Sequence, residues 1–199
     1  LPGGVVWRPY SMVNTADDND LEFFSILVPG GAFSGRLAVT RIGDPLFVEK
    51  QPYGFLTAGR FKGGRHLWLL ASGTGFAPIK ALIEHARHLG SQRPMVLYWG
   101  GRKAKDLYLS SWAEQVAQAW PLLRFVPVLS EADAGWTGRT GFVHQAVMAD
   151  LPDLSGHQVY ACGAPLMVEA AHRDFVAQCG LPGDEFFADA FTSEADKHA

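Results

Sequence analysis

The sequence predicts a short all-β region followed by a doubly wound α/β domain with a parallel sheet. Before residue 50, short apolar stretches alternate with turns that contain glycine and proline. After Gly63, apolar strand-like stretches alternate with helix-like ones. Two of the later strands end in glycine and lead into a helix with proline in its first turn. Strands that alternate with helices form parallel sheets with helices on both faces.

The region before residue 60 is expected to contain few regular elements. Residues 21–28 and 46–49 are predicted strands, the turn Pro29-Gly30-Gly31 follows the first of them, and one helical turn is expected over 34–38. Three or four short strands expose their edges and close no core of their own. Either this region packs against the α/β domain or further strands of it are missing from the sequence.

A glycine-rich polar stretch over residues 56–64 marks the boundary between the two regions. Beyond it, five strands and four helices are expected in alternation. The predicted strands are 66–71, 94–99, 124–129, 158–162 and 185–191, and the predicted helices lie around 79–89, 107–119, 141–148 and 166–179. Open sheets of this kind bind ligands at the carboxyl ends of their strands.

The composition is that of an ordinary soluble protein, with 199 residues, 48% hydrophobic residues, 19% charged residues and a net charge of -3. Lysine and arginine are scattered rather than arranged in a stripe, which argues against a nucleic-acid partner. The longest apolar runs are far shorter than a membrane span, and the first residues do not resemble a signal peptide. We expect a cytoplasmic monomer with no nucleic-acid or membrane partner.

Cysteine and histidine are sparse and dispersed. The two cysteines, Cys162 and Cys179, exclude a disulfide scaffold and an iron–sulfur cluster held by four cysteines of this chain, and they favour a reducing compartment. Cys179 precedes a glycine at a predicted helix end and is interpreted as structural. His85 and His88 lie three residues apart, but no further ligands converge on them, so no metal site is expected.

The segment Ser72-Gly73-Thr74-Gly75-Phe76-Ala77-Pro78 joins a predicted strand to a predicted helix. Glycines let the backbone approach a ligand, and the start of a helix offers N–H groups and a positive dipole end to an anion. Pro78 suits the first helical turn because its missing N–H would be unpaired there. The segment therefore predicts a diphosphate site. It lacks the third glycine of the full dinucleotide fingerprint, so a tight turn without a ligand is the alternative.

The segment Ala161-Cys162-Gly163-Ala164-Pro165-Leu166-Met167 repeats this arrangement of strand end, glycine and proline-initiated helix. Two such junctions on neighbouring parallel strands would line one crevice for a dinucleotide. At this strand end, the small thiol of Cys162 would pack beside a nicotinamide without crowding it. The alternative is a buried structural cysteine.

The segment Arg8-Pro9-Tyr10-Ser11 brings together a cation, an aromatic ring and a hydroxyl. A flavin cofactor needs these groups: a guanidinium for its diphosphate, a ring against the isoalloxazine or ribityl, and a hydrogen-bond partner near N5. The alternative is edge-strand packing. Gly30-Gly31-Ala32-Phe33-Ser34 precedes a predicted helical turn and would offer backbone N–H groups to the same diphosphate.

Taken in this order, these motifs resemble the ferredoxin–NADP⁺ reductase family over nearly the whole chain. The segments 8–14, 20–24 and 28–31 are most similar to bacterial ferredoxin (flavodoxin) reductases. The ending Asp189-Ala190-Phe191-Thr192-Ser193-Glu194 resembles their carboxyl terminus, where a small residue lies over the flavin and the next aromatic residue reaches the adenine.

The resemblance implies an FAD-binding partial antiparallel β-barrel over residues 1–60 and an NAD(P)-binding α/β domain over residues 61–199. It implies hydride transfer from NAD(P)H to flavin N5, then single-electron transfer to ferredoxin, flavodoxin or another one-electron carrier. Such hydride transfer needs no protein acid or base, so positioning and electrostatics are the protein's part. Ser11, Thr74 and Cys162 are the implied catalytic residues. The implied FAD contacts are Arg8, Pro9, Tyr10, Ser11, Gly31, Phe33, Ser34, Ala190 and Phe191, and the implied nucleotide contacts are Gly73, Thr74, Gly75, Pro78, Cys162, Gly163 and Met167.

Family members begin with further strands that complete the flavin barrel, whereas this sequence opens just before the arginine motif at Leu1-Pro2-Gly3-Gly4. These four residues resemble a turn inside a hairpin. We therefore expect a preceding segment of several tens of residues, and retention of FAD by these 199 residues is an open question.

The choice between NADH and NADPH depends on the end of the strand 124–129. NADP-specific relatives carry an arginine after the serine there, whereas Ser130 is followed by Glu131 and then Asp133. A carboxylate repels a 2′-phosphate and accepts hydrogen bonds from a ribose hydroxyl, which favours NADH. Glu131 as a solvated loop charge is the alternative. Arg102 and Arg139 remain candidate phosphate ligands.

Three functional hypotheses follow. The first is the FAD-dependent ferredoxin or flavodoxin reductase, with an NADH-dependent reductase component of an oxygenase system as its variant, because residues 136–143 and 186–191 resemble such components. The second is a redox-inactive nucleotide-binding module, against which Arg8, Tyr10 and Ser11 argue. The third, a hydrolase, is set aside because the sequence has no Gly-x-Ser-x-Gly elbow.

Overall fold

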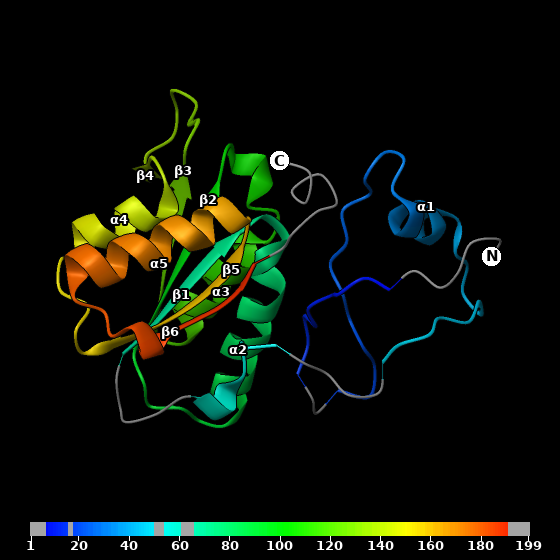
Figure 1. Cartoon of the computed structure of the whole chain (residues 1–199), viewed down its shortest axis with the longest axis horizontal. Helices are drawn as coiled ribbons and strands as arrows, with labels where there is room; N and C mark the ends of the chain where they lie inside the picture. The colour runs from blue at the N-terminus through cyan, green and yellow to red at the C-terminus, as the bar shows by residue number, and fades with distance from the viewer. Residues whose placement is uncertain (1–6, 16–17, 50–53, 61–65, 191–199) are drawn as a thin grey trace.

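A parallel six-stranded sheet forms the centre of the molecule, which is represented by a computed structural model that describes residues 7–15, 18–49, 54–60 and 66–190 (Figure 1). The strand order is β4-β3-β2-β1-β5-β6, and every neighbouring pair is parallel. The strands are β1 (His66–Ser72), β2 (Met95–Gly101), β3 (Leu123–Leu129), β4 (Arg139–Thr140), β5 (His157–Gly163) and β6 (Phe186–Ala190). The predicted parallel α/β sheet is therefore confirmed.

Two pairs of helices cover the two faces of this sheet. The helices are α1 (Ala32–Val39), α2 (Phe76–His88), α3 (Ser110–Ala119), α4 (Val143–Asp150) and α5 (Pro165–Cys179). Four short 3-10 helices, η1 (Ala58–Arg60), η2 (Gly73–Gly75), η3 (Ala104–Asp106) and η4 (Gly183–Glu185), shape the connections. Helices α2 and α3 pack on one face, and α4 and α5 pack on the other (Figure 1). None of the described helices is long and apolar enough to cross a membrane.

The sequence of β1 shows why the sheet is covered on both faces. Leu67 and Leu69 point into the first core cluster, on the α2 side, whereas Trp68 and Leu70 point into the second, on the α5 side. All four are buried. A strand whose successive side chains alternate between two apolar layers is a continuous apolar run in sequence, as expected for a central parallel strand.

Several element boundaries differ from the prediction. Helix α2 begins at Phe76 rather than near Ile79, so that Pro78 is its third residue and still lies in the first turn, where an N–H would be unpaired. Helix α3 begins at Ser110 because the preceding residues close a short turn after η3. The two-residue strand β4 was not predicted, because so short a segment carries no apolar pattern.

The predicted strands over residues 21–28 and 46–49 do not form in the part of the chain that the structure describes. One isolated antiparallel bridge, between Met12 and Phe23, is present there. The prediction of these strands was wrong because an apolar stretch becomes a strand only where a neighbouring backbone supplies hydrogen bonds. Ile26, Leu27 and Phe47 are instead exposed. The partial barrel is therefore not observed.

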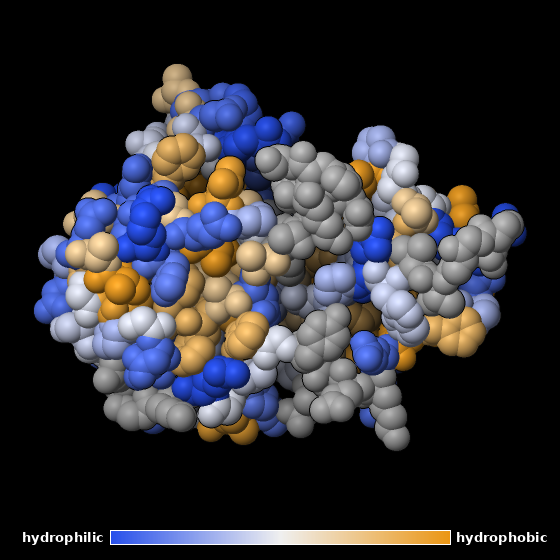
Figure 2. All heavy atoms as spheres, in the orientation of Figure 1, coloured by the Kyte–Doolittle hydropathy of each residue, from blue (hydrophilic) through white to orange (hydrophobic). Residues whose placement is uncertain are grey.

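One prediction for the N-terminal region (residues 7–60) is confirmed and extended. The helical turn expected over residues 34–38 is the eight-residue helix α1. The N-terminal region lies beside α2 (Figure 1), and Phe24 and Leu56 pack against the first core cluster. Apolar side chains that find no such partner contribute to its surface (Figure 2).

Candidate functional site

The carboxyl ends of β1 and β5 lie side by side at the point where the strand order reverses. The chain builds the sheet from β1 to β4 in one direction and then returns to place β5 on the other side of β1. Ala71 and Cys162 are direct partners in the parallel register. Helices α2 and α5, which follow these strands, cover opposite faces, so that their beginnings flank one crevice. The two predicted junctions therefore meet.

Glycines are required at these two junctions because the backbones nearly touch. A Cβ atom on Gly75 would overlap the carbonyl group of Cys162, and one on Gly163 would overlap the Ser72 hydroxyl. Gly163 and Gly73 have φ angles of 146° and 52°, a region that other residues rarely adopt. The N–H of Ala164 donates to Ser72 Oγ at 3.1 Å and links the loops directly.

The two helix N-termini at the crevice have no side-chain caps. Gly75 is the N-cap of α2, and no side chain caps this end. Helix α5 starts with Pro165 at its first position, as predicted, and again no side chain caps the helix. Helix N-termini without side-chain caps leave N–H groups that can bind an anion, and each adds a positive partial charge. Thr74 is partly exposed on the first junction, and Met167 is partly exposed in the first turn of α5.

Cys162 is fully buried at this crevice. Desolvation raises the pKa of its thiol, and the nearby carboxylate of Asp189 raises it further. The thiol therefore stays protonated at neutral pH and is suited to packing rather than to nucleophilic attack. Cys179 is also buried, at the end of α5, which agrees with its structural interpretation.

The flavin-side residues gather around the start of α1. The ring centroids of Tyr10 and Phe33 are 5.3 Å apart, and the Tyr10 hydroxyl lies 3.1 Å from Ser25 Oγ. Gly31 is the N-cap of α1. The structure thus brings Tyr10 of the first motif together with Phe33 of the glycine motif. Their contact with FAD stays a prediction.

A tight turn fixes the start of α1. The Gly31 N–H donates to the Val28 carbonyl at 2.9 Å, and Gly30 has a φ of 74°, which defines a type II turn with Pro29 at its second position. Ser34 Oγ donates to the Val28 carbonyl and accepts from its N–H, each at 3.1 Å. The buried Ser34 hydroxyl therefore closes the turn, and no side chain caps the N-terminus of α1.

The loops after β2 and β3 lie beside each other and carry balanced charges. The Glu131 N–H donates to the Arg102 carbonyl at 2.9 Å, which places the predicted specificity residues together. Lys103 Nζ lies 3.0 Å from Asp133 Oδ1, and this hydrogen bond raises the pKa of Lys103. Ser130 and Glu131 are both exposed. A 2′-phosphate placed here would meet cations that already have carboxylate partners.

The backbone of Arg139 pairs with Val128 near the end of β3, but its side chain already has a carboxylate partner. Its guanidinium pairs with the carboxylate of Asp150 at the end of α4, and the same carboxylate accepts a 2.7 Å hydrogen bond from the Tyr98 hydroxyl. Arg102 is exposed, with its Nε 3.9 Å from Asp106 Oδ2. Ala190 ends β6 next to Gly163, its predicted contact with FAD stays a prediction, and Phe191 lies outside the described residues.

Two acidic residues of the site were not singled out from the sequence. Asp189 pairs in register with Cys162, and its carboxylate accepts a hydrogen bond from the Phe55 N–H at 3.2 Å. Asp106 accepts hydrogen bonds from the Arg102 and Lys103 N–H groups, both at 3.0 Å, and these bonds lower the pKa of its carboxyl group. An acidic residue inside an apolar strand, and a carboxylate five residues after a strand end, were the available signals.

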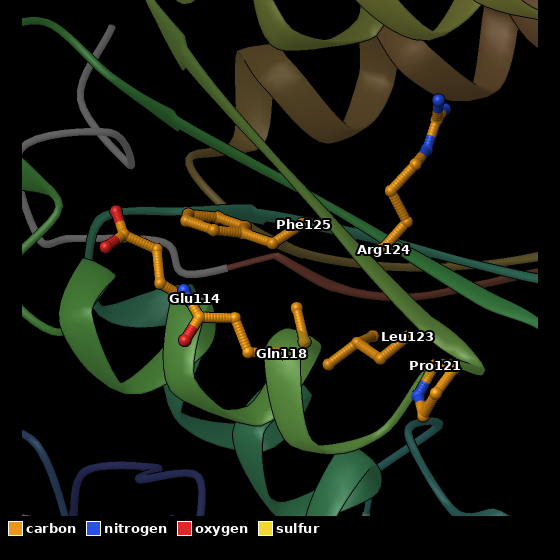
Figure 3. Close-up of a pocket in the computed structure, with 7 residues that line it drawn as sticks. Glu114, Gln118, Pro121, Leu123, Arg124 and Phe125 are labelled. Atoms are coloured by element: carbon orange, nitrogen blue, oxygen red, sulfur yellow. The ribbon is translucent and has the colours of Figure 1, made fainter.

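Two hollows of the surface lie away from this crevice. One is a shallow groove between α3 and the first half of β3, where Glu114 and Gln118 face Phe125, and Arg124 points to the other side of the strand (Figure 3). A second lies between α5 and β6, beside Phe55 and His172. Both are open and shallow, and neither contains the glycine junctions.

A parallel sheet with two glycine junctions at its switch point defines a dinucleotide-binding α/β domain. The chain belongs to the oxidoreductase NAD-binding domain family, whose model matches residues 69–173. The resemblance to ferredoxin–NADP⁺ reductases is confirmed, because relatives that are named as a flavin reductase and as a ferredoxin–NAD(P)⁺ reductase component also match.

Relatives with known names match almost the whole chain. The CDP-6-deoxy-L-threo-D-glycero-4-hexulose-3-dehydrase reductase of Yersinia pestis is 48% identical over 185 residues, which cover 92% of this chain and 55% of the relative. The NAD(P)H-flavin reductase of Aliivibrio fischeri is 38% identical over 191 residues, which cover 92% of this chain and 80% of the relative. The crystal structure of the Amycolatopsis cytochrome P450 reductase GcoB superposes with a TM-score of 0.80 at 32% identity, over 97% of this chain and 59% of that one.

The chain spans about half the length of the first of these relatives, 55% of the Yersinia reductase. The matched residues include both glycine junctions, because they cover 92% of this chain. The comparison therefore establishes the family of the domain.

Proposed function

We propose that the chain is part of a flavoprotein reductase that accepts hydride from NAD(P)H and delivers electrons singly to ferredoxin, flavodoxin or another one-electron carrier. The observation that carries the proposal is the close approach of Gly75 to the Cys162 carbonyl at the carboxyl edge of the sheet. This approach leaves two helix N-termini facing one crevice, where a Cβ atom would destroy the fit. A dinucleotide diphosphate suits such a cradle.

The flavin-side residues fit FAD. When bound, FAD accepts a hydride at N5 together with a proton, and it can return the two electrons one at a time. Arg8 and the N–H groups at the start of α1 would hold its diphosphate, and Tyr10 would pack against the ring system. Ser11 would lie near N5, and Thr74 and Cys162 would face the nicotinamide. The neutral thiol of Cys162 supports a packing role.

We place the boundary between the two functional regions at residue 60. Residues 1–60 would form the last part of an antiparallel FAD-binding barrel, and residues 61–199 would form the NAD(P)-binding domain. The exposed apolar side chains of the N-terminal region support this division, because further strands would cover them. The longer relatives supply the length for such strands.

NADH is the favoured nucleotide. The exposed carboxylate of Glu131 and the pairing of Lys103 with Asp133 leave little uncompensated positive charge for a 2′-phosphate. The experiment is a comparison of NADH and NADPH affinities for the chain and its Glu131→Gln variant. The variant is expected to gain affinity for NADPH, and Glu114→Gln, an exposed carboxylate in the groove between α3 and β3, serves as the control. A wild-type preference for NADPH would contradict this part of the proposal.

A reductase that serves another enzyme directly is a second candidate. The similarity to the Yersinia dehydrase reductase and to the P450 reductase supports it, together with the segment 136–143. A redox-inactive nucleotide-binding module is a third candidate. The grouping of Tyr10, Phe33 and the start of α1 favours a flavin function over this third one.

Flavin binding and nucleotide binding are tested separately. The purified chain is titrated with NADH and NADPH by calorimetry, then mixed with FAD and freed of unbound cofactor. We expect nucleotide binding, and a yellow complex that bleaches anaerobically when NADH is added. A chain that binds neither nucleotide would overturn the proposal. Nucleotide binding without flavin binding, also in a version extended to the length of the relatives, would favour the redox-inactive module.

A further inference from the structure

Phe24 and Tyr108 join the N-terminal region to the sheet domain. Their ring centroids are 5.4 Å apart at an interplanar angle of 90°, an edge-to-face contact. Phe24 directly follows Phe23, whose backbone forms the antiparallel bridge with Met12, and the ring of Tyr10 lies 6.1 Å from that of Phe23. Phe24 is therefore attached to the stretch that carries the flavin-side motif.

On its other side, Tyr108 contacts two aromatic rings of the sheet domain. Its centroid lies 5.2 Å from that of Trp99 at 88°, and 6.3 Å from that of Phe76 at 80°. Trp99 and Phe76 are stacked with centroids 3.8 Å apart and an interplanar angle of 9°. We call Phe24, Tyr108, Trp99 and Phe76 the aromatic cluster. It forms an unbroken series of ring contacts between the two regions.

The position of Trp99 depends on these rings. Its side chain is fully buried, and its indole N–H has no hydrogen-bond partner among the described residues. Without a hydrogen bond to fix the indole, packing alone determines where it lies. Phe76 packs on one face of the indole, and Tyr108 packs against it at right angles.

Phe76 connects the aromatic cluster to the nucleotide crevice. It is the first residue of α2 and immediately follows Gly75, whose backbone lies against the Cys162 carbonyl. A displacement of the Phe76 ring would move the start of α2 and the N–H groups proposed to bind the diphosphate. Because the backbone at Gly75 already lies against the Cys162 carbonyl, such a displacement would disturb the arrangement of these N–H groups.

Tyr108 is itself held by a well-defined turn. The Asp106 carboxylate accepts the N–H groups of Arg102 and Lys103, and the next residue, Leu107, is buried. The Tyr108 hydroxyl has no hydrogen bond to another described residue, and 43% of the side chain is exposed. The ring and not the hydroxyl therefore makes the contacts.

We propose that Tyr108 is a positioning residue that fixes the Gly73–Gly75 junction relative to the flavin-side motif. The inference rests on the proposed function, because it assigns to the junction a bound nicotinamide nucleotide. Phe24 is the partner of Tyr108 in the N-terminal region. The aromatic cluster couples the place where the hydride donor binds to the segment that would carry the hydride acceptor.

The test is a double-mutant cycle on the affinity of the 199-residue chain for NADH, measured by calorimetry. Tyr108→Ala and Phe24→Ala are each expected to weaken binding about 2- to 10-fold, the range that corresponds to one aromatic pair. The double variant is expected to bind no more weakly than the weaker single variant, since both remove the same contact. Tyr108→Phe is expected to retain wild-type affinity, because it keeps the ring.

Phe142→Ala is the matched control, since Phe142 is an exposed aromatic residue that stacks on His144 and not on the aromatic cluster. Urea unfolding of each variant checks the fold, and Tyr108→Leu replaces Tyr108→Ala if the latter unfolds. Wild-type affinity in Tyr108→Ala or Tyr108→Leu, or fully multiplicative effects in the double variant, would overturn the inference alone. Failure of the wild-type chain to bind any nicotinamide nucleotide would overturn the proposed function as well.

Discussion

The N-terminal region and the sheet domain use apolar residues in opposite ways. Phe47 is 86% exposed, whereas Phe175 of α5 is fully buried between the helix and the sheet. Both regions contain apolar stretches of similar length in sequence. The difference shows that an apolar stretch stabilises a fold only where the topology supplies a surface to cover it. The sheet domain provides that surface for itself.

The same contrast applies to hydrogen bonding. In the sheet domain, backbone groups pair along five neighbouring strand contacts. In the N-terminal region, side chains satisfy the backbone locally, as when Asn14 accepts from the Glu22 N–H and donates to the Asp20 carbonyl. Local bonds hold turns in place but do not resist global unfolding as a ladder does. The junctions at β1 and β5 are therefore the rigid half of the site.

Truncation of one phenylalanine in each region gives the largest expected difference. Phe175→Ala removes a fully buried ring and is expected to lower the free energy of unfolding by about 3–5 kcal/mol. Phe47→Ala changes an exposed ring and is expected to stay within about 0.5 kcal/mol of the wild type. Urea unfolding followed by circular dichroism measures both. A comparable loss in Phe47→Ala would show that this ring is covered in solution.

A methyl group at the first junction tests the rigidity of the crevice. Gly75→Ala forces a Cβ atom against the Cys162 carbonyl and is expected to lower the free energy of unfolding by about 1–3 kcal/mol. Gly135→Ala is the matched control, because nothing lies within 4 Å of a Cβ atom there. Calorimetric titration with NADH is expected to show a loss of affinity in the first variant alone. Unchanged affinity in Gly75→Ala would contradict the proposed role of the junction.

The buried thiol of Cys162 predicts a dependence of stability on pH. Burial raises the pKa of this thiol above its value in the unfolded chain, which is about 8.5. The native state then binds more protons than the unfolded state, so the free energy of unfolding decreases as pH rises above that value. The expected contribution is at most about 1.4 kcal/mol per pH unit.

Cys162→Ala isolates this contribution from those of the other groups with raised pKa values, such as Tyr108 and Tyr160. Urea unfolding is measured at a series of pH values from 7 to 10. The free energy of unfolding is expected to decrease less with pH in the variant than in the wild type, because burial raises the pKa of the Cys162 thiol in the folded state. Parallel pH profiles would mean that the thiol is accessible to water.

The centre of the sheet was predictable from the sequence because the apolar pattern of its strands indicates that they are buried on both faces. β1 and β5 are uninterrupted apolar runs between glycine-rich ends, and both strands and junctions lie where they were expected. The strands over residues 21–28 and 46–49 were not predictable in this way. Their apolar pattern indicates which side chains favour burial. It does not show whether a partner strand is present, because that depends on the tertiary structure.

The parts of the site that were missed depend on contacts between residues distant in sequence. The Asp189 carboxylate bonds to the Phe55 N–H across 134 residues, and Phe24 meets Tyr108 across the boundary between the regions. Neither the periodicity of apolar residues nor the spacing of motifs in the sequence predicts such contacts. The two glycine junctions were found because each is local, with its strand end, glycine and helix start all within seven residues.

Ser34→Ala is expected to have the smallest effect on the stability of the whole chain. It tests whether the N-terminal region unfolds independently of the sheet domain. The Ser34 hydroxyl bonds to both backbone groups of Val28, so its loss is expected to cost about 0.5–1.5 kcal/mol within that turn. Because the turn packs apart from the core clusters, the urea midpoint of the sheet domain should be unchanged. Hydrogen exchange should be faster at the Val28 and Gly31 amides, while the amides of β1 retain their protection. A shift of the global midpoint would mean that the two regions unfold as one unit, and the contrast between them would then apply to packing but not to stability.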